Sequence, residues 1–125
     1  MKVILDASAL LAWLQDEPGV EVVEEALSTA AISSLNWSEV YQKSLIHGVD
    51  VNGLRSDLEA VGLVILPFDA EDAERAATLW KAGSGLSLAD RACLALGARY
   101  RVPVWTTDRA WAQAVTGADV RVLRP

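Results

Sequence analysis

Short apolar runs alternate with longer amphipathic stretches along this chain. The apolar runs predict strands at residues 3–6, 31–33, 63–68, 102–105 and 120–123. The stretches between them predict helices at residues 9–14, 19–27, 37–46, from 50 or 52 to about 62, 69–80, 87–100 and 107–115. This alternation is typical of a parallel sheet covered by helices on both faces. We therefore predict an α/β protein with three layers, in which a mostly parallel central sheet is flanked by helices.

Four acidic residues stand where a strand or loop gives way to a helix: Asp6, Glu39, Asp90 and Asp108. A carboxylate at the end of a buried strand costs free energy unless it is paired or bound to a metal. In parallel α/β sheets the ligand site lies beyond the carboxyl ends of the strands, so the fold permits these four acids to converge. Their mutual repulsion would then require a cation, and oxygen-only ligands favour Mg²⁺ or Mn²⁺.

Three of these acids, taken one at a time, also have a structural interpretation. Glu39 fits a capping box with Asn36 and could pair with Lys43 one turn later. Asp90 fits a capping box of its own, and Asp108 could simply favour the positive end of its helix. For any single acid, this interpretation deserves at least equal weight.

Two of the acids argue against a purely structural account of the set. Asp6 lacks a capping role, because Ser8 is better placed to cap the first helix. Asp90 shares its helical face with Cys93 and other apolar residues, and an acid on such an inward-facing stripe prefers a partner or a metal. Ser8 and Thr106 could be caps only, or could hold the carboxylates by hydrogen bonds.

The composition narrows the class of protein. The chain has 125 residues, 52% of them hydrophobic, which predicts one domain over residues 1–125 with a sizeable core. We expect no signal peptide and no membrane span. The single cysteine, Cys93, excludes an internal disulfide and suits a reducing cytosol, so we expect a cytoplasmic protein. Cys93 and the single histidine, His47, argue against a structural zinc site and against histidine-based nucleophilic catalysis.

The net charge of −6 hides an uneven distribution. Residues 1–80 carry 4 basic and 14 acidic side chains, whereas residues 81–125 carry 7 basic and 3 acidic ones. Asp90 and Asp108 are each followed directly by an arginine, Arg91 and Arg109. A basic rim around a carboxylate–metal centre would suit a polyanionic substrate. The remaining arginines of this segment could equally be solvated surface.

Four stretches together resemble a known family. They are residues 3–10 (VILDASAL), 37–40 (WSEV), 86–96 (LSLADRACLAL) and 106–111 (TTDRAW). Their order and spacing resemble those of the PIN-domain ribonucleases, in particular the VapC-type toxins of toxin–antitoxin pairs. The resemblance implies a PIN fold over most of the chain, with the acids gathered in one negatively charged pocket.

The resemblance also implies roles for particular residues. The metal-binding catalytic acids would be Asp6, Glu39, Asp90 and Asp108. The polar supports would be Ser8 and Thr106. Arg91 and Arg109 are our candidates for contacts to RNA phosphates.

The activity implied by the resemblance is hydrolysis of RNA phosphodiester bonds by an endoribonuclease that uses Mg²⁺ or Mn²⁺, leaving a 5′-phosphate and a 3′-hydroxyl. The class of RNA stays open. The implied partners are a second copy in a homodimer and a cognate antitoxin whose tail lies along an apolar groove. Apolar residues of the first helix could line that groove or belong to the core: Leu10, Leu11, Trp13 and Leu14.

Other classes of protein fit the sequence less well. A phosphotransferase of the haloacid-dehalogenase kind needs a second acid where this chain has Ser8. A response-regulator receiver needs paired acids near the start and a late lysine, and no lysine follows Lys81. A binding module that keeps the PIN fold without catalysis is the non-enzyme alternative, but it has little reason to hold four unfavourable charges together.

Overall fold

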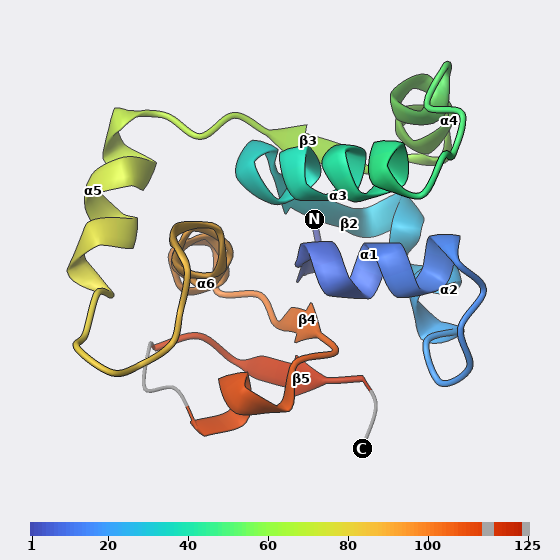
Figure 1. The fold of residues 1–125 in the computed structure, drawn as a ribbon. Coiled ribbons are helices and arrows are strands. Elements are labelled where there is room, and N and C mark those ends of the chain that lie inside the picture. The colour runs from blue at the N-terminus through green and yellow to red at the C-terminus, as the bar shows by residue number, and fades with distance from the viewer. Residues whose placement is uncertain (114–116, 124–125) are drawn as a thin grey trace.

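The computed structural model describes residues 1–113 and 117–123, which build one sheet of five strands between two layers of helices (Figure 1). The strands are β1 (Val3–Leu5), β2 (Ala30–Ser33), β3 (Val64–Leu66), β4 (Val104–Thr106) and β5 (Val120–Val122). Their order is β3-β2-β1-β4-β5, and all four pairings are parallel. The prediction of an α/β fold with a parallel sheet is confirmed, and β1 lies at its centre.

The helices connect successive strands. They are α1 (Ala7–Leu14), α2 (Val22–Ala26), α3 (Ser34–Ile46), α4 (Leu54–Val61), α5 (Ala70–Thr78) and α6 (Leu88–Tyr100), with 3₁₀ turns at η1 (Leu27–Thr29) and η2 (Arg109–Gln113). Where a helix was predicted at residues 107–115, the described residues form a 3₁₀ turn that begins at Arg109, and residues 114 and 115 lie outside the described residues. In the described part of the chain, no helix is long and apolar enough to cross a membrane.

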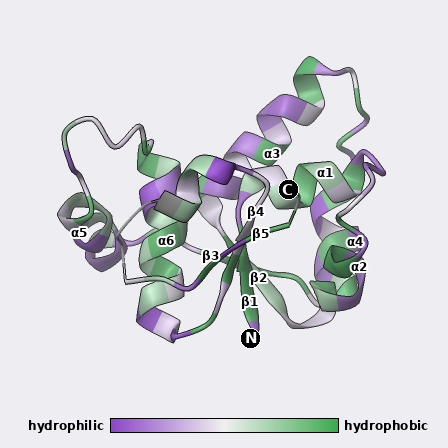
Figure 2. Cartoon of the chain, turned by 90° about the horizontal axis from the view of Figure 1, so that it is seen from below, coloured by the Kyte–Doolittle hydropathy of each residue, from purple (hydrophilic) through white to green (hydrophobic). Residues whose placement is uncertain are grey.

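Alternate residues of the central strands face two separate cores, as the two-residue period of a strand requires. Leu5 and Ile32 pack with Leu10 and other residues of the α1 side of the sheet, whereas Ile4 and Val104 pack against the α6 side. Figure 2 shows these largely hydrophobic strands between the two helical layers.

The apolar residues of α1 belong to the first of these cores. Leu10 and Leu11 are buried, and Trp13 and Leu14 pack partly buried against the same cluster. This placement favours the core interpretation of these residues over the groove interpretation.

Helix α6 lies unusually close to the sheet at one point. A Cβ atom added to Gly97 would clash with the side chain of Val104 on β4. Glycine at this position therefore permits the depth at which α6, and with it Asp90, sits against the sheet.

Helix α3 begins three residues earlier than predicted. Ser33 is its N-cap, and the Ser33 hydroxyl oxygen accepts a hydrogen bond from the Leu35 amide at 3.2 Å. Asn36 consequently lies inside the helix rather than at its start, so the predicted capping box between Asn36 and Glu39 is wrong. The earlier start places Glu39 in the second turn, one turn further into the helix than expected.

Candidate active site

The four predicted acids line one cavity of about 160 Å³. Asp6 directly follows β1, Asp108 lies two residues beyond β4, Asp90 is in the first turn of α6, and Glu39 comes from α3. The complete lining is Asp6, Ala7, Ser8, Asn36, Glu39, Lys43, Asp90, Asp108 and Trp111. The fold thus brings together the acids from four separate segments, as the sequence analysis predicted.

Asp6 is the most constrained of the acids. It is only 4% exposed, and its Oδ1 accepts hydrogen bonds from the Ala9 amide at 2.8 Å and from the Ser8 hydroxyl at 2.7 Å. The Thr106 hydroxyl donates to Oδ2 at 2.5 Å. Asp6 is therefore the N-cap of α1, which corrects the expectation that Ser8 caps this helix. All these hydrogen-bond donors, drawn from the described residues, are neutral.

The surroundings of Asp6 oppose its ionisation. Burial raises the pKa of Asp6 from 3.8 to about 6, although the hydrogen bonds from Thr106, Ala9 and Ser8 act in the opposite direction. The negative charge of Asp90 also contributes to this rise in the pKa of Asp6. Above about pH 6, Asp6 is thus a buried anion, and its hydrogen bonds offset only part of the free-energy cost of burying its charge.

Ser8 and Thr106 connect Asp6 to the loop after β4. The Ser8 hydroxyl oxygen accepts a hydrogen bond from the Thr107 amide at 3.0 Å, and the Thr106 hydroxyl oxygen accepts one from the Asp108 amide at 3.0 Å. The Asp108 side chain is exposed and accepts from the Ala110 amide at 2.9 Å. Both hydroxyls therefore hold the ends of β1 and β4 in register at the cavity.

Asp90 has a capping role as well as a place in the cavity. The Ser87 amide donates to Asp90 Oδ2 at 3.0 Å, and the Asp90 amide donates to the Ser87 hydroxyl oxygen at 3.1 Å, which is the predicted capping box. The structural and the functional interpretation of Asp90 are therefore compatible.

Glu39 is partly buried beside Asp90. Burial, and then the negative charge of Asp90, raise the pKa of Glu39, whereas the positive charge of Lys43 and a hydrogen bond from Asn36 act against this rise. The negative charge of Asp90 thus acts on both of the other carboxylates, because it raises the pKa of Asp6 and of Glu39.

Asn36 is a site residue that the sequence analysis missed. Its side chain is almost completely buried, and Nδ2 donates to Glu39 Oε1 and to the Ala89 carbonyl, both at 3.3 Å. Asn36 Oδ1 is buried without a hydrogen-bond partner among the described residues. The interpretation of Asn36 as a helix cap concealed this role, and its three-residue spacing from Glu39 was the available signal.

The two arginines predicted to contact RNA lie outside the cavity lining. Arg91 is partly buried and donates from Nη1 to the Ala76 carbonyl on α5 at 3.0 Å. Arg109 directly follows Asp108, and its side chain is exposed. Their contacts to RNA stay predictions.

The oxygen atoms around the cavity are chemically suited to bind a hard divalent cation. Carboxylates, hydroxyls and the unpaired amide oxygen of Asn36 are oxygen ligands of the kind that Mg²⁺ and Mn²⁺ prefer. In residues 1–113 and 117–123, however, no three Asp, Glu, His or Cys side chains form a group that could hold a metal ion as they stand. A metal would require these side chains to move closer together.

The chain belongs to the PIN domain family, which it matches over residues 3–116. No curated protein matches its sequence. The fold is similar to that of a toxin–antitoxin complex from Klebsiella pneumoniae, with a TM-score of 0.73, 22% identity, and coverage of 94% of this chain and 99% of that chain.

Two further structures are similar to this chain over nearly its full length. VapBC2 from Rickettsia felis, bound to a DNA fragment from its promoter, gives a TM-score of 0.68 at 16% identity, covering 97% of this chain and 98% of that chain. DNA-bound VapBC from Salmonella typhimurium gives 0.66 at 18% identity, covering 97% of each chain. The predicted PIN fold is confirmed, and so is the resemblance to VapC-type proteins at the level of the fold.

Proposed function

We propose that this protein is an endoribonuclease toxin that depends on Mg²⁺ or Mn²⁺ and is held inactive by a cognate antitoxin. The observation that carries the proposal is the cavity lined by Asp6, Glu39, Asp90 and Asp108, in which Asp6 is buried and its described hydrogen-bond partners are all neutral. PIN domains are generally nucleases, which supports a hydrolase acting on nucleic acids.

The size and charge of the cavity suit a phosphodiester group. Pockets for small organic ligands usually measure about 300–1,000 Å³, whereas this cavity measures about 160 Å³. It would admit a cation and a phosphate group more readily than a whole nucleotide. An acidic site of this kind attracts a polyanion only when a cation reverses its charge.

The residues that would hold the cation are Asp6, Glu39 and Asp90, with Asp108 at the exposed edge. A bound divalent ion would supply an acidified water molecule and neutralise charge on the phosphate oxygens. The chain itself contributes orientation: Ser8, Ala9 and Thr106 fix the Asp6 carboxylate, and Asn36 fixes Glu39. The capping box holds Asp90 Oδ2 toward its own helix.

The partners in this proposal rest on two kinds of support. The similar structures include a toxin–antitoxin complex and two VapBC complexes, which supports a cognate antitoxin. Exposed apolar side chains at the end of α3 support self-association as a homodimer, because Leu45 is 54% and Ile46 69% exposed.

A PIN-fold binding module without catalysis is the second candidate. The observation that favours it is that no three carboxylates among the described residues are gathered into a metal group. Such a module would hold RNA or a protein without cutting it.

Cleavage of total RNA by the purified chain, with Mn²⁺ and with chelator, distinguishes the two candidates. Asp90→Asn is the test variant, because an asparagine oxygen can still accept from the Ser87 amide and keep the helix cap. Asp119→Asn is the control, because Asp119 is exposed and pairs with Arg121 outside the cavity. We expect discrete metal-dependent cuts with the wild type and Asp119→Asn, and none with Asp90→Asn.

Two results would contradict the proposal. Undiminished metal-dependent cutting by Asp90→Asn would reject this cavity as the active site. Absence of cutting by folded wild-type protein free of any bound partner would favour the binding module. If cuts are found, sequencing of their 5′ ends identifies the RNA and the cleaved position.

A further inference from the structure

Lys43 is the one basic side chain that lines the acidic cavity in the described part of the chain. It lies on α3 one turn after Glu39, so both residues occupy the same face of the helix. The side chain of Lys43 is exposed, which leaves its ammonium group accessible to a ligand that enters the cavity.

The ammonium group of Lys43 is not committed to a partner. It forms no ion pair or hydrogen bond with any other described residue, although it is close enough to Glu39 to influence that carboxylate electrostatically. A flexible lysine with three free donors can follow a phosphate group without fixed geometry.

Most other cations of the described chain are already engaged. Arg75 and Arg99 bind Asp72, Arg55 pairs with Glu59, and Arg121 pairs with Asp119. The guanidinium group of Arg91 binds the Ala76 carbonyl and thereby links α6 to α5. Arg109 is also exposed and outside these contacts, but of the described cations only Lys43 lines the cavity.

We infer that Lys43 binds a backbone phosphate of the RNA adjacent to the scissile one. This inference rests on the proposed nuclease function and assigns a residue to the substrate side of the same site. A phosphate next to the reacting one does not change during the reaction, so its contact with Lys43 would be equally strong in the bound substrate and in the transition state. Lys43 is therefore expected to act on substrate binding rather than on the chemical step.

Lys43 also has two structural interpretations that the test must separate from this one. It lies in the last turn of α3, where a positive charge favours the negative pole of the helix. It could also serve only to moderate the charge of Glu39. In the second case, its loss would change the rate of the chemical step and leave substrate affinity unchanged.

The experiment measures kcat and KM over a range of salt concentrations, on a short unpaired RNA that contains a site cut by the wild type. Lys43→Gln removes the charge while keeping a long polar side chain, and Lys43→Arg restores the charge. Lys81→Gln is the matched control, because Lys81 is an exposed lysine that does not line the cavity.

We expect Lys43→Gln to raise KM on the order of fivefold at low salt with kcat unchanged. The slope of log(kcat/KM) against log[salt] should fall by roughly 0.7, the value for one lost contact to a single strand. Lys43→Arg should restore both quantities, and Lys81→Gln should leave both at their wild-type values.

A lower kcat with unchanged KM and salt slope for Lys43→Gln would overturn the inference. It would mean that Lys43 acts by moderating the charge of Glu39. Wild-type values throughout for Lys43→Gln would reject Lys43 alone and leave the nuclease function standing. A wild-type protein that cuts no RNA would overturn the proposed function and this inference with it.

Discussion

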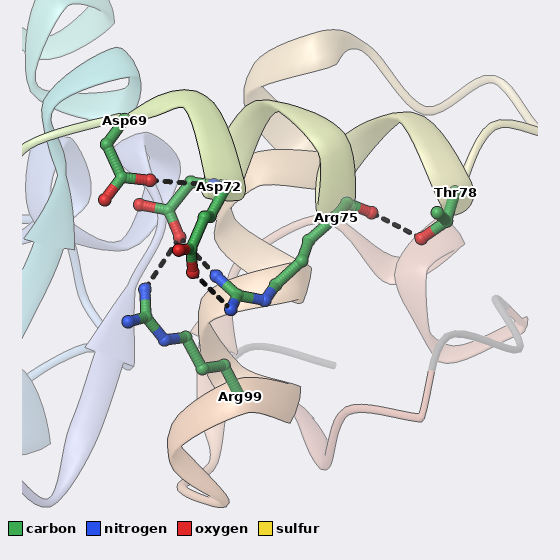
Figure 3. Close-up of polar contacts among 6 residues, drawn as sticks. Asp69, Asp72, Arg75, Thr78 and Arg99 are labelled. Atoms are coloured by element: carbon green, nitrogen blue, oxygen red, sulfur yellow. Dashed lines mark hydrogen bonds and ion pairs between the residues drawn. The ribbon is translucent and has the colours of Figure 1, made fainter.

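Two buried aspartates of this protein are held in opposite ways. Asp72 on α5 is 6% exposed and accepts hydrogen bonds from Arg99 at 2.9 Å and Arg75 at 3.3 Å (Figure 3). Asp6 at the cavity is 4% exposed, and its hydrogen-bond donors among the described residues are all neutral: the hydroxyls of Ser8 and Thr106 and the Ala9 amide. Within residues 1–113 and 117–123, the chain thus supplies two cations to one buried carboxylate and none to the other.

This difference separates a stabilising arrangement from a functional one. Around Asp72, the opposite charges link α5 to α6, so this carboxylate takes part in the packing of two helices. Around Asp6, the charge that the fold leaves uncompensated is available to a cation from solution. Sites that bind or react commonly lower the stability of the fold in this way.

The largest expected effect is on the stability of the metal-free protein. The folded pKa of Asp6, about 6, lies above its ordinary value of 3.8, so the ionised carboxylate disfavours folding by about 3 kcal/mol. The contribution of Asp6 is fully favourable below about pH 3.8 and is lost as the pH rises through about 6. Because asparagine carries no charge, we expect Asp6→Asn to lose no stability through this ionisation and to be more stable than the wild type above pH 6.

Urea denaturation in chelator over a series of pH values measures this effect. Asp6→Asn should show a flatter dependence of the unfolding free energy on pH between about 4 and 7. Identical pH profiles for the two proteins would mean that Asp6 is not an unfavourable charge, and the comparison with Asp72 would fail.

Metal binding should produce the next largest effect. An ion that binds only the folded state stabilises it by about 2.7 kcal/mol at a concentration one hundred times its Kd. We expect Mn²⁺ to raise the melting temperature of the wild type and to raise that of Asp6→Asn much less. Calorimetry without RNA provides the readout, and equal stabilisation of both proteins would place the ion elsewhere.

Asp72→Asn should have a smaller effect of the opposite sign. Loss of a buried ion-pair partner can cost about 3–5 kcal/mol, but the side chains of Arg75 and Arg99 remain 39% and 34% exposed. We therefore expect a loss of about 1–2 kcal/mol. Asp119→Asn, which removes an exposed pair, should change stability by less than about 0.5 kcal/mol.

The decisive outcome is whether Asp72→Asn lowers or raises stability. The denaturant midpoints of Asp72→Asn and Asp119→Asn, compared with the wild type, measure it. A stabilising Asp72→Asn would show that the two arginines do not compensate the buried charge. The two aspartates would then differ in surroundings but not in energetic role.

The sequence was sufficient to predict the parallel sheet, and it permitted the acids to converge without requiring that all four do so. Both follow from chain-local signals: apolar runs of strand length, and acids at the points where strands end. The carboxyl ends of parallel strands share one edge, so Asp6 and the residues after β4 had to meet. The catalytic roles of these acids stay predictions.

The details that sequence reasoning missed depend on competition between neighbours. Ser33 and Asn36 are both residue types that can cap α3, and in the structure Ser33, the last residue of β2, is the cap. Asp6 and Ser8 could likewise each cap α1, and the pairing of β1 with β4 brings Thr106 to Asp6. The sequence identified Lys43 only as a possible partner of Glu39. That Lys43 also lines the cavity depends on how α3 packs against the other elements, which the sequence does not show.

The central position of β1 also has a consequence for how the protein is made. β1 and β4 pair through Ile4 and Val104, and the hydrogen bond from Thr106 to Asp6 spans one hundred residues of chain. During synthesis, a nascent chain that has not yet reached Asp108 cannot assemble the cavity, however well its earlier helices have folded. The cavity therefore forms only after the chain from β1 through Asp108 has been synthesised, which delays the site relative to the helices that precede β4.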